Sequence, residues 1–157
     1  MGVDMIPYTV EQVADTLIHV ARQRGLSDMT NLKLQKLLYY AQAWNLAFTG
    51  SVLFPDDIEA WVHGPVVPKV FRRFKALGWK PIESQVTPQN DVYLSGHIKS
   101  ILTAYGAFGA IQLERLTHSE DPWKIARGGL PPDVSCNTVI ARKDMTQYYR
   151  ARISGSR

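Results

Sequence analysis

Apolar residues recur every three or four positions across residues 10–23, and this spacing predicts an amphipathic helix. The apolar positions are Val10, Val13, Ala14, Leu17, Ile18 and Ala21. Thr9 and Gln12 match a capping box, in which each side chain satisfies an exposed amide at the start of a helix. Gly25 is expected to end the helix.

The following segment is apolar around almost its whole circumference. A helix is predicted to begin at residues 28–30, to run to about Phe48 and to stop at Thr49 and Gly50. A helix that is apolar nearly all round is typical of the buried centre of a domain. Lys33 and Lys36 share one face, and we expect them to reach solvent or a partner.

A minor β element and a basic helix are predicted next. Residues 58–62 carry β-branched or aromatic side chains at alternate positions and favour an edge strand or extended segment. Pro68 is expected to open a third helix that stops at Gly78, because a missing amide is tolerated in the first turn. Its charged face holds Lys69, Arg72, Arg73 and Lys75, while Phe71 and Phe74 are expected to face inward.

The second half of the chain reads as helices separated by turns. Residues 79–95 contain Pro81, Pro88 and Asn90 and are predicted to be loop, with a short strand at 92–94. Helices are then expected at 97–105, at about 110–117, from Pro122 with Asp121 as N-cap, and at about 142–151. Met145, Tyr148 and Tyr149 of the last helix are expected to face inward.

These elements predict a mostly α fold, α+β with a minor β element. We expect a compact single-domain helical bundle around a buried central helix 30–48, with one domain over 1–157 and its core at about 8–152. The apolar content of 45% supports a globular fold. Met5 is an alternative natural start.

Charge and composition narrow the function only a little. The formal charge of +4 favours acidic partners or nucleic acid without distinguishing them. No apolar run reaches the length of a membrane span and no secretory signal is visible, so a cytoplasmic protein is expected. Cys136 is the single cysteine and is expected to be a small core group.

No common catalytic motif is present. The four histidines lie far apart in the sequence and none has a second ligand at metal-binding spacing, so neither a metal nor another cofactor is expected. An enzyme would have to use a corner formed by His63, His118 and Glu120. At that corner Arg127 is expected to pair with Glu120 or Glu59.

Three longer motifs carry a family resemblance. They are TNLKLQKLLYYAQ at 30–42, EAWVHGPV at 59–66 and LTHSEDPWKIAR at 116–127. In this order and at this spacing they resemble the Panacea (SocA-like) domain family, which consists mostly of bacterial, often prophage-associated antitoxins. The resemblance implies a protein-binding module that neutralises a toxin encoded beside it by direct complex formation. It also allows a proteolytic adaptor that delivers the toxin to a ClpXP-type protease, and it implies no catalytic residues.

The motifs leave the binding surface open. Their polar and aromatic members are structural or functional: Lys33, Lys36, Glu59, Trp61, His63, His118, Glu120, Trp123 and Arg127. A scaffold that binds unrelated toxins should contact them outside the shared motifs, so partner binding is predicted at Lys69, Arg72, Arg73 and Lys75. Nucleic-acid binding is the competing hypothesis. It would use this basic helix, or a helix-turn-helix that exposes Lys33, Gln35, Lys36 and Tyr40.

Overall fold

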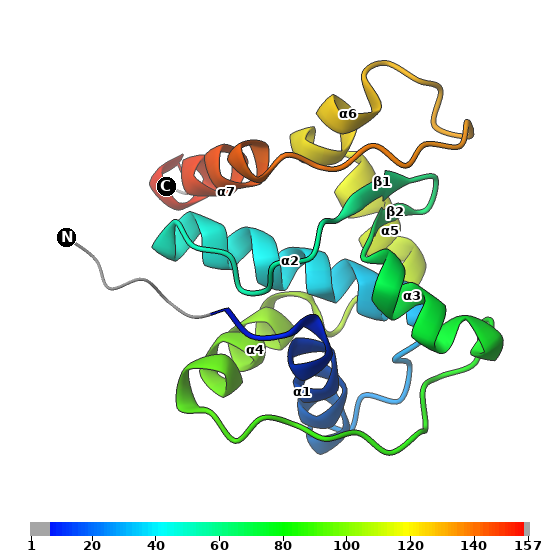
Figure 1. Ribbon diagram of the computed structural model, residues 1–157, viewed down its shortest axis with the longest axis vertical. Coiled ribbons are helices and arrows are strands. Elements are labelled where there is room, and N and C mark those ends of the chain that lie inside the picture. Colours follow the sequence, from blue (N-terminus) through cyan, green and yellow to red (C-terminus); the bar gives the residue numbers. More distant parts are fainter. Residues whose placement is uncertain (1–6, 156–157) are drawn as a thin grey trace.

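The computed structural model describes residues 7–155, and Figure 1 shows a helical assembly around one long central helix, α2 (Asn31–Thr49). The alternative start at Met5 lies outside the described residues. The other helices are α1 (Val10–Gln23), α3 (Pro68–Phe74), α4 (Val92–Tyr105), α5 (Ala110–His118), α6 (Asp121–Arg127) and α7 (Arg142–Gly155), with a 3₁₀ turn at Lys75–Leu77. The expected mostly α fold with a minor β element is confirmed.

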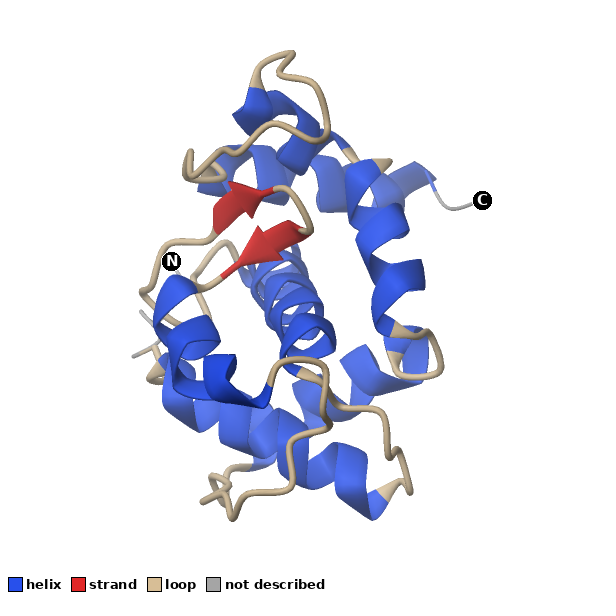
Figure 2. Cartoon of the chain, turned by 90° about the vertical axis from the view of Figure 1, so that its right-hand side faces the viewer, coloured by secondary structure: helices blue, strands red, loops and turns tan. Residues whose placement is uncertain are grey.

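Helix α2 is surrounded on every side. It packs against α1, α3, α4, α5, α7 and the second strand, and Figure 2 views it nearly end-on among them. The Thr30 hydroxyl accepts a hydrogen bond from the amide of Lys33 at its start, and Gly50 ends it with φ of 76°. Leu34, Leu37 and Leu38 have no exposed surface. The predicted buried central helix is therefore confirmed.

Helix α1 has the predicted capping box between Thr9 and Gln12. Its outer face holds the long loop that leads to α4. Arg22 donates to the carbonyls of Ile82 and Ser84, and Asp15 accepts from the amide of Thr87. The loop is thus fixed on the bundle by hydrogen bonds that no periodicity in its own sequence reveals.

The strand expected at residues 92–94 is wrong, because α4 begins at Val92. Asp91 is the N-cap, and its carboxylate accepts a 2.8 Å hydrogen bond from the amide of Leu94. The buried Leu94 side chain then fixes the first turn against the core. A cap and one buried contact outweigh the β propensity of Val92 and Tyr93.

The expected extended segment is the first strand of a hairpin. Strands β1 (Glu59–Trp61) and β2 (Gly64–Val66) pair antiparallel, with Ala60 opposite Pro65. Strand β2 was not predicted from the sequence, because Pro65 lacks an amide and the strand has only three residues. Pro68 opens α3 as predicted.

The last two helices differ from expectation only at their ends. Glu120 is the N-cap of α6 and Asp121 is its first residue, and α7 continues to Gly155 rather than Ala151. Met145 and Tyr149 face inward as expected, and Tyr148 packs partly buried against the core. Within residues 7–155, none of the helices combines the length and apolar content that a bilayer crossing requires.

Candidate functional site

The two motif lysines of α2 are buried, which corrects the expectation that they reach solvent or a partner. Neither side chain has exposed surface. The ammonium of Lys33 lies 2.8 Å from an Asp28 carboxylate oxygen and donates to the Gly106 carbonyl at 2.7 Å. Lys36 donates to the carbonyl of Pro65 at 2.9 Å, and burial lowers its pKa to about 7. Each lysine therefore supports backbone from another part of the fold.

Glu120 accepts hydrogen bonds from two tyrosines. The hydroxyls of Tyr40 and Tyr149 donate to its Oε1 atom at 2.7 and 2.8 Å, and the Tyr39 hydroxyl lies 3.1 Å from that of Tyr149. Burial raises the pKa of Glu120, although these hydrogen bonds oppose the shift. Glu120 and these tyrosines form one hydrogen-bonded cluster that joins α2, α7 and the corner between α5 and α6.

The next motif residues connect the hairpin to α6. The Trp61 indole donates to Glu59 at 2.8 Å, and the Trp123 indole donates to the Trp61 carbonyl at 2.8 Å. Arg127 donates to the carbonyls of Ala60, Pro131 and Val134, so its expected pairing with Glu120 or Glu59 is wrong. It is 3% exposed and its guanidinium lies 4.7 Å from the Trp123 ring centre. The Ala60 carbonyl belongs to the hairpin, and the other two carbonyls belong to the loop after α6. Arg127 therefore holds the hairpin and this loop together.

His63 and His118 belong to separate contacts. The exposed His63 side chain lies 3.2 Å from Glu114, while His118 stacks on Trp123 with ring centres 3.9 Å apart. Burial lowers the pKa of His118, and its Nε2 atom makes no hydrogen bond within the described residues. The carboxylate of Glu114 acts on both His63 and His118, whereas Glu120 accepts from tyrosines, so the three expected residues do not form one shared site. No cluster of three potential metal ligands is found within residues 7–155.

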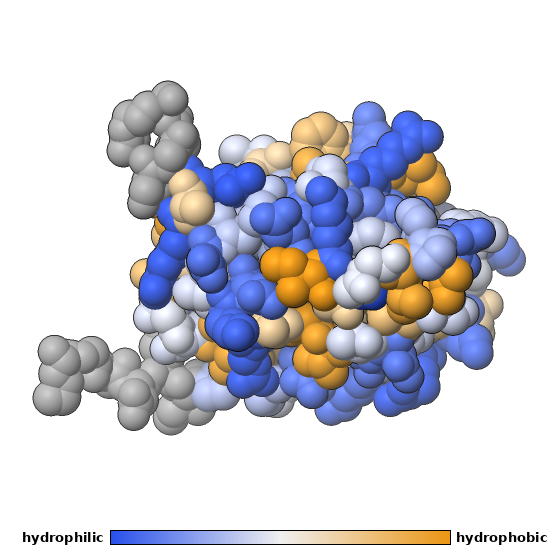
Figure 3. All heavy atoms as spheres, turned by 90° about the horizontal axis from the view of Figure 1, so that it is seen from above, coloured by the Kyte–Doolittle hydropathy of each residue, from blue (hydrophilic) through white to orange (hydrophobic). Residues whose placement is uncertain are grey.

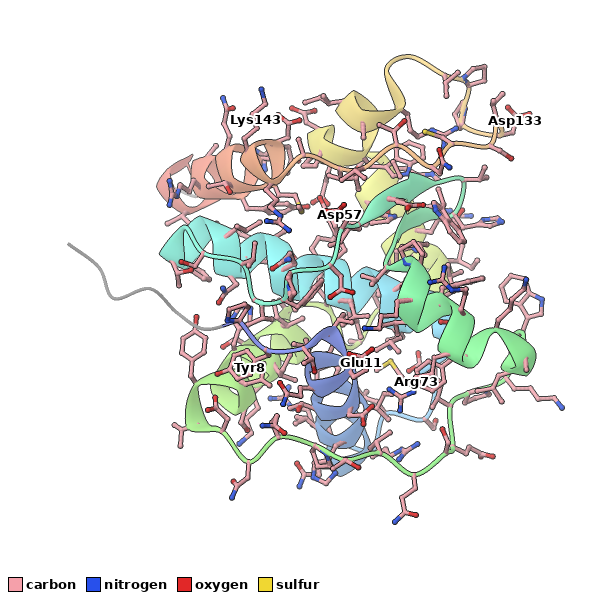
Figure 4. All side chains as sticks on the ribbon, viewed as in Figure 1. Tyr8, Glu11, Asp57, Arg73, Asp133 and Lys143 are labelled. Atoms are coloured by element: carbon pink, nitrogen blue, oxygen red, sulfur yellow. The ribbon has the colours of Figure 1, made fainter. Side chains whose placement is uncertain are left out.

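The four basic residues proposed for partner binding fall into two pairs. Lys69 lies 3.0 Å from Glu11, and Arg73 lies 2.7 Å from Asp15. Figure 4 labels Glu11 and Arg73, which lie where α1 and α3 meet. Arg72 and Lys75 are exposed and have no ion-pair partner among the described residues. Among these four residues, Arg72 and Lys75 could meet an acidic partner without displacing an acid of the described chain.

Beside Lys75 lies an apolar groove of about 740 Å³, referred to below as the α3 groove. Its lining residues are Asn31, Leu32, Trp61, Val62, His63, Val66, Phe71, Lys75, Gly78, Trp79, Ser135, Cys136 and Asn137. Phe71 is only partly buried, which corrects its expected inward position, and Cys136 is partly exposed on the groove wall rather than in the core. This groove could not be predicted from the sequence, because its walls come from four separate segments.

A second groove of about 670 Å³ lies between the end of α2 and α4. Trp44, Phe48, Tyr93 and His97 are among its lining residues. Further apolar side chains are exposed on α6 and the loop after it, and Figure 3, which looks down on this end, shows hydrophobic patches separated by hydrophilic residues. The α3 groove differs from the second groove in having a lysine in its wall.

The helix-turn-helix hypothesis is wrong for α2. Lys33, Gln35, Lys36 and Tyr40 are all buried, so no face of this helix can enter a DNA groove. Nucleic-acid binding would have to use the exposed cations of α3.

Most polar residues of the motifs therefore bond to other parts of the fold. Residues 34–124 match the family model described as "Antitoxin SocA-like, Panacea domain". The chain belongs to this family. It is 32% identical to Antitoxin SocA of Caulobacter vibrioides (strain NA1000 / CB15N) over 145 residues, which cover 80% of this chain and 76% of the relative. No solved structure matches the chain.

Proposed function

We propose that this chain is a single-domain, non-enzymatic antitoxin that acts in the cytoplasm. It binds a toxin encoded beside it and blocks the toxin by direct complex formation. The observation that carries this proposal is the similarity to Antitoxin SocA along most of both chains. An antitoxin needs a stable surface that recognises its toxin, and it needs no catalytic group of its own.

The geometry favours recognition over chemistry. Lys36 and Arg127 are buried against carbonyls of the chain itself, and the partly buried Glu120 accepts a hydrogen bond from Tyr40, so these groups already have partners within the fold. The exposed groups that remain available include Arg72, Lys75 and the aromatic side chains of the α3 groove. Aromatic and arginine side chains are the residues that most often dominate protein interfaces.

An enzymatic role would depend on His118, and substitution of this residue tests it. Under the antitoxin proposal, His118→Ala removes the stacking contact with Trp123 and lowers stability, while toxin neutralisation persists once the amount of folded protein is matched. Loss of neutralisation with unchanged stability would favour catalysis instead. His19→Ala is the control, because this partly exposed histidine of α1 lies outside the stack and outside the lining of both grooves.

Co-expression with the neighbouring reading frame tests the proposal directly. Growth rescue together with a stable complex in co-purification is the expected result. Rescue that requires a ClpXP-type protease, without a stable complex, would replace direct blocking by an adaptor mechanism. A neighbour that is harmless on its own would contradict the antitoxin role, and salt-dependent DNA binding through α3 would then be measured.

A further inference from the structure

The α3 groove is formed before any partner binds. The Asn31 side chain donates to the Phe71 carbonyl at 3.0 Å, and Gln35 bonds both Asn31 and the amide of Val67. The Trp61 and Phe71 rings meet edge to face with centres 5.1 Å apart. These contacts fix the start of α2, the hairpin and α3 against one another. A preformed groove lowers the ordering free energy that binding must overcome.

Trp79 gives the groove an exposed aromatic edge. Its side chain is 74% exposed although it lines the groove, and it follows Gly78, whose φ is 57°. Because this ring adjoins an apolar groove rather than standing alone, a partner that covers both removes a contiguous apolar surface from water. Tryptophan is also enriched among the residues that carry most of the binding energy at interfaces.

The charges around the groove favour one kind of partner. Residues 61–82, which supply most of the lining, include Lys69, Arg72, Arg73, Lys75 and Lys80 but neither Asp nor Glu. Of the acids in adjacent segments, Asp28 pairs with Lys33 and Glu59 accepts from Trp61. Glu83 is exposed, but it does not line the groove. Asp133, on the loop that carries Cys136, is the acid of that wall and does not line the groove.

From this combination we infer that the α3 groove holds a segment of the partner toxin that inserts an aromatic or branched apolar side chain flanked by Asp or Glu. The apolar side chain packs among Trp61, Phe71 and Trp79, and the flanking carboxylates meet Lys75 and Arg72. The second groove lacks such cations in its wall. This inference rests on the proposed antitoxin function and specifies which surface performs it.

Cys136 provides a probe of the groove that needs no mutation. It is the single cysteine of the chain and it lines the groove. Alkylation by iodoacetamide is measured on the full chain alone and in complex with the co-expressed product of the neighbouring reading frame. A seated segment excludes the reagent, so alkylation is expected to slow by at least about tenfold, in line with the extent to which interface cores exclude solvent.

A matched pair of aromatic substitutions locates the contact independently. Trp79→Ser is expected to weaken the complex roughly 30-fold, as for an interface hot spot, whereas Phe48→Ser in the second groove leaves affinity unchanged. Both side chains are largely exposed, at 74% and 62%, so both variants are expected to fold. A complex that forms with unchanged Cys136 alkylation, or that responds to Phe48→Ser and not to Trp79→Ser, overturns the groove assignment alone.

Two other results also overturn it. Protection of Cys136 that grows with the concentration of the chain alone assigns the groove to a second copy. Failure of the wild-type chain to form any complex contradicts the proposed function itself, and with it this inference.

Discussion

The hydroxyl of Tyr149 donates a 2.8 Å hydrogen bond to Glu120, and this contact fastens α7 to the corner between α5 and α6. Tyr40 of the central helix donates to the same carboxylate oxygen. One acidic group thus connects three parts of the chain that lie far apart in sequence. Glu120 resembles a catalytic acid in the sequence, whereas in the fold its carboxylate holds these three parts together.

Replacing Glu120 by glutamine separates its hydrogen bonds from its charge. Burial raises the pKa of Glu120, so the folded state favours the neutral carboxyl group. Glu120→Gln keeps an acceptor and is expected to be at least as stable as wild type near neutral pH. Glu120→Ala leaves the Tyr40 and Tyr149 hydroxyls without their acceptor and is expected to lose about 1–3 kcal/mol. Urea unfolding measures both variants.

The sign of the pH effect gives a control for this prediction. A raised folded-state pKa means that the contribution of Glu120 is full at low pH and is lost as pH rises through the folded pKa. The advantage of Glu120→Gln over wild type should therefore grow as pH rises from acid to neutral. Equal destabilisation by Gln and Ala would show that the charge itself is required.

Lys36 is expected to make stability depend on pH in the alkaline range. Burial lowers its pKa from 10.5 to about 7, so between these values the unfolded chain binds the extra proton and the free energy of unfolding rises with pH. Buried tyrosines such as Tyr40 have raised pKa values and reverse this trend above about pH 10, where tyrosines of the unfolded chain ionise.

A methionine substitution isolates this contribution. Lys36→Met is expected to flatten the rise in urea midpoint between about pH 7 and about pH 10, because it removes the titrating amine and keeps the buried stem. Lys99→Met, at an exposed position of α4, is the matched control and should keep the wild-type slope. Parallel profiles for Lys36→Met and wild type would contradict the lowered pKa.

Gly64 is expected to tolerate no side chain, because Lys36 lies beneath it. A Cβ atom there would come within 2.6 Å of Lys36 Cε and 2.9 Å of Thr117 Oγ1, and its φ of 103° is unfavourable for other residues. Gly64→Ala should therefore lose about 3 kcal/mol through strain and overpacking. Gly128→Ala has positive φ but open space, so it should lose only about 1 kcal/mol. Similar losses in thermal or urea unfolding would contradict the close approach.

The parts of the fold that local chemistry determines were predictable from the sequence. The capping box at Thr9, the all-round apolar α2 and the start of α3 at Pro68 depend on neighbours within one helix. Strand β2 and the helical start at Val92 were not predicted, since a partner strand fixes the first and the Asp91 cap with buried Leu94 fixes the second.

The candidate site was less predictable for the same physical reason. Spacing alone places Lys33 and Lys36 on one face, but only the Gly106 and Pro65 carbonyls, distant in sequence, explain why their amines are buried. An ion pair between α1 and α3 likewise engages Arg73, while Arg72 has no ion-pair partner among residues 7–155. Long-range partners, which a single sequence does not display, determine which charges remain available.

Charge reversal at the free pair tests how the basic face of α3 contributes to binding. Arg72→Glu with Lys75→Glu is expected to slow association with the neighbour's product about tenfold at low salt, with a smaller effect at high salt, because long-range attraction to an acidic partner is lost.

Lys99→Glu with Lys143→Glu, on α4 and α7, changes the net charge by the same amount and serves as the control. Arg73 is left unchanged, since its reversal would place a carboxylate against Asp15 and lower stability. Association rates from stopped-flow mixing at two salt concentrations decide the matter. Equal slowing by both double variants would mean that net charge, rather than this face, steers the encounter.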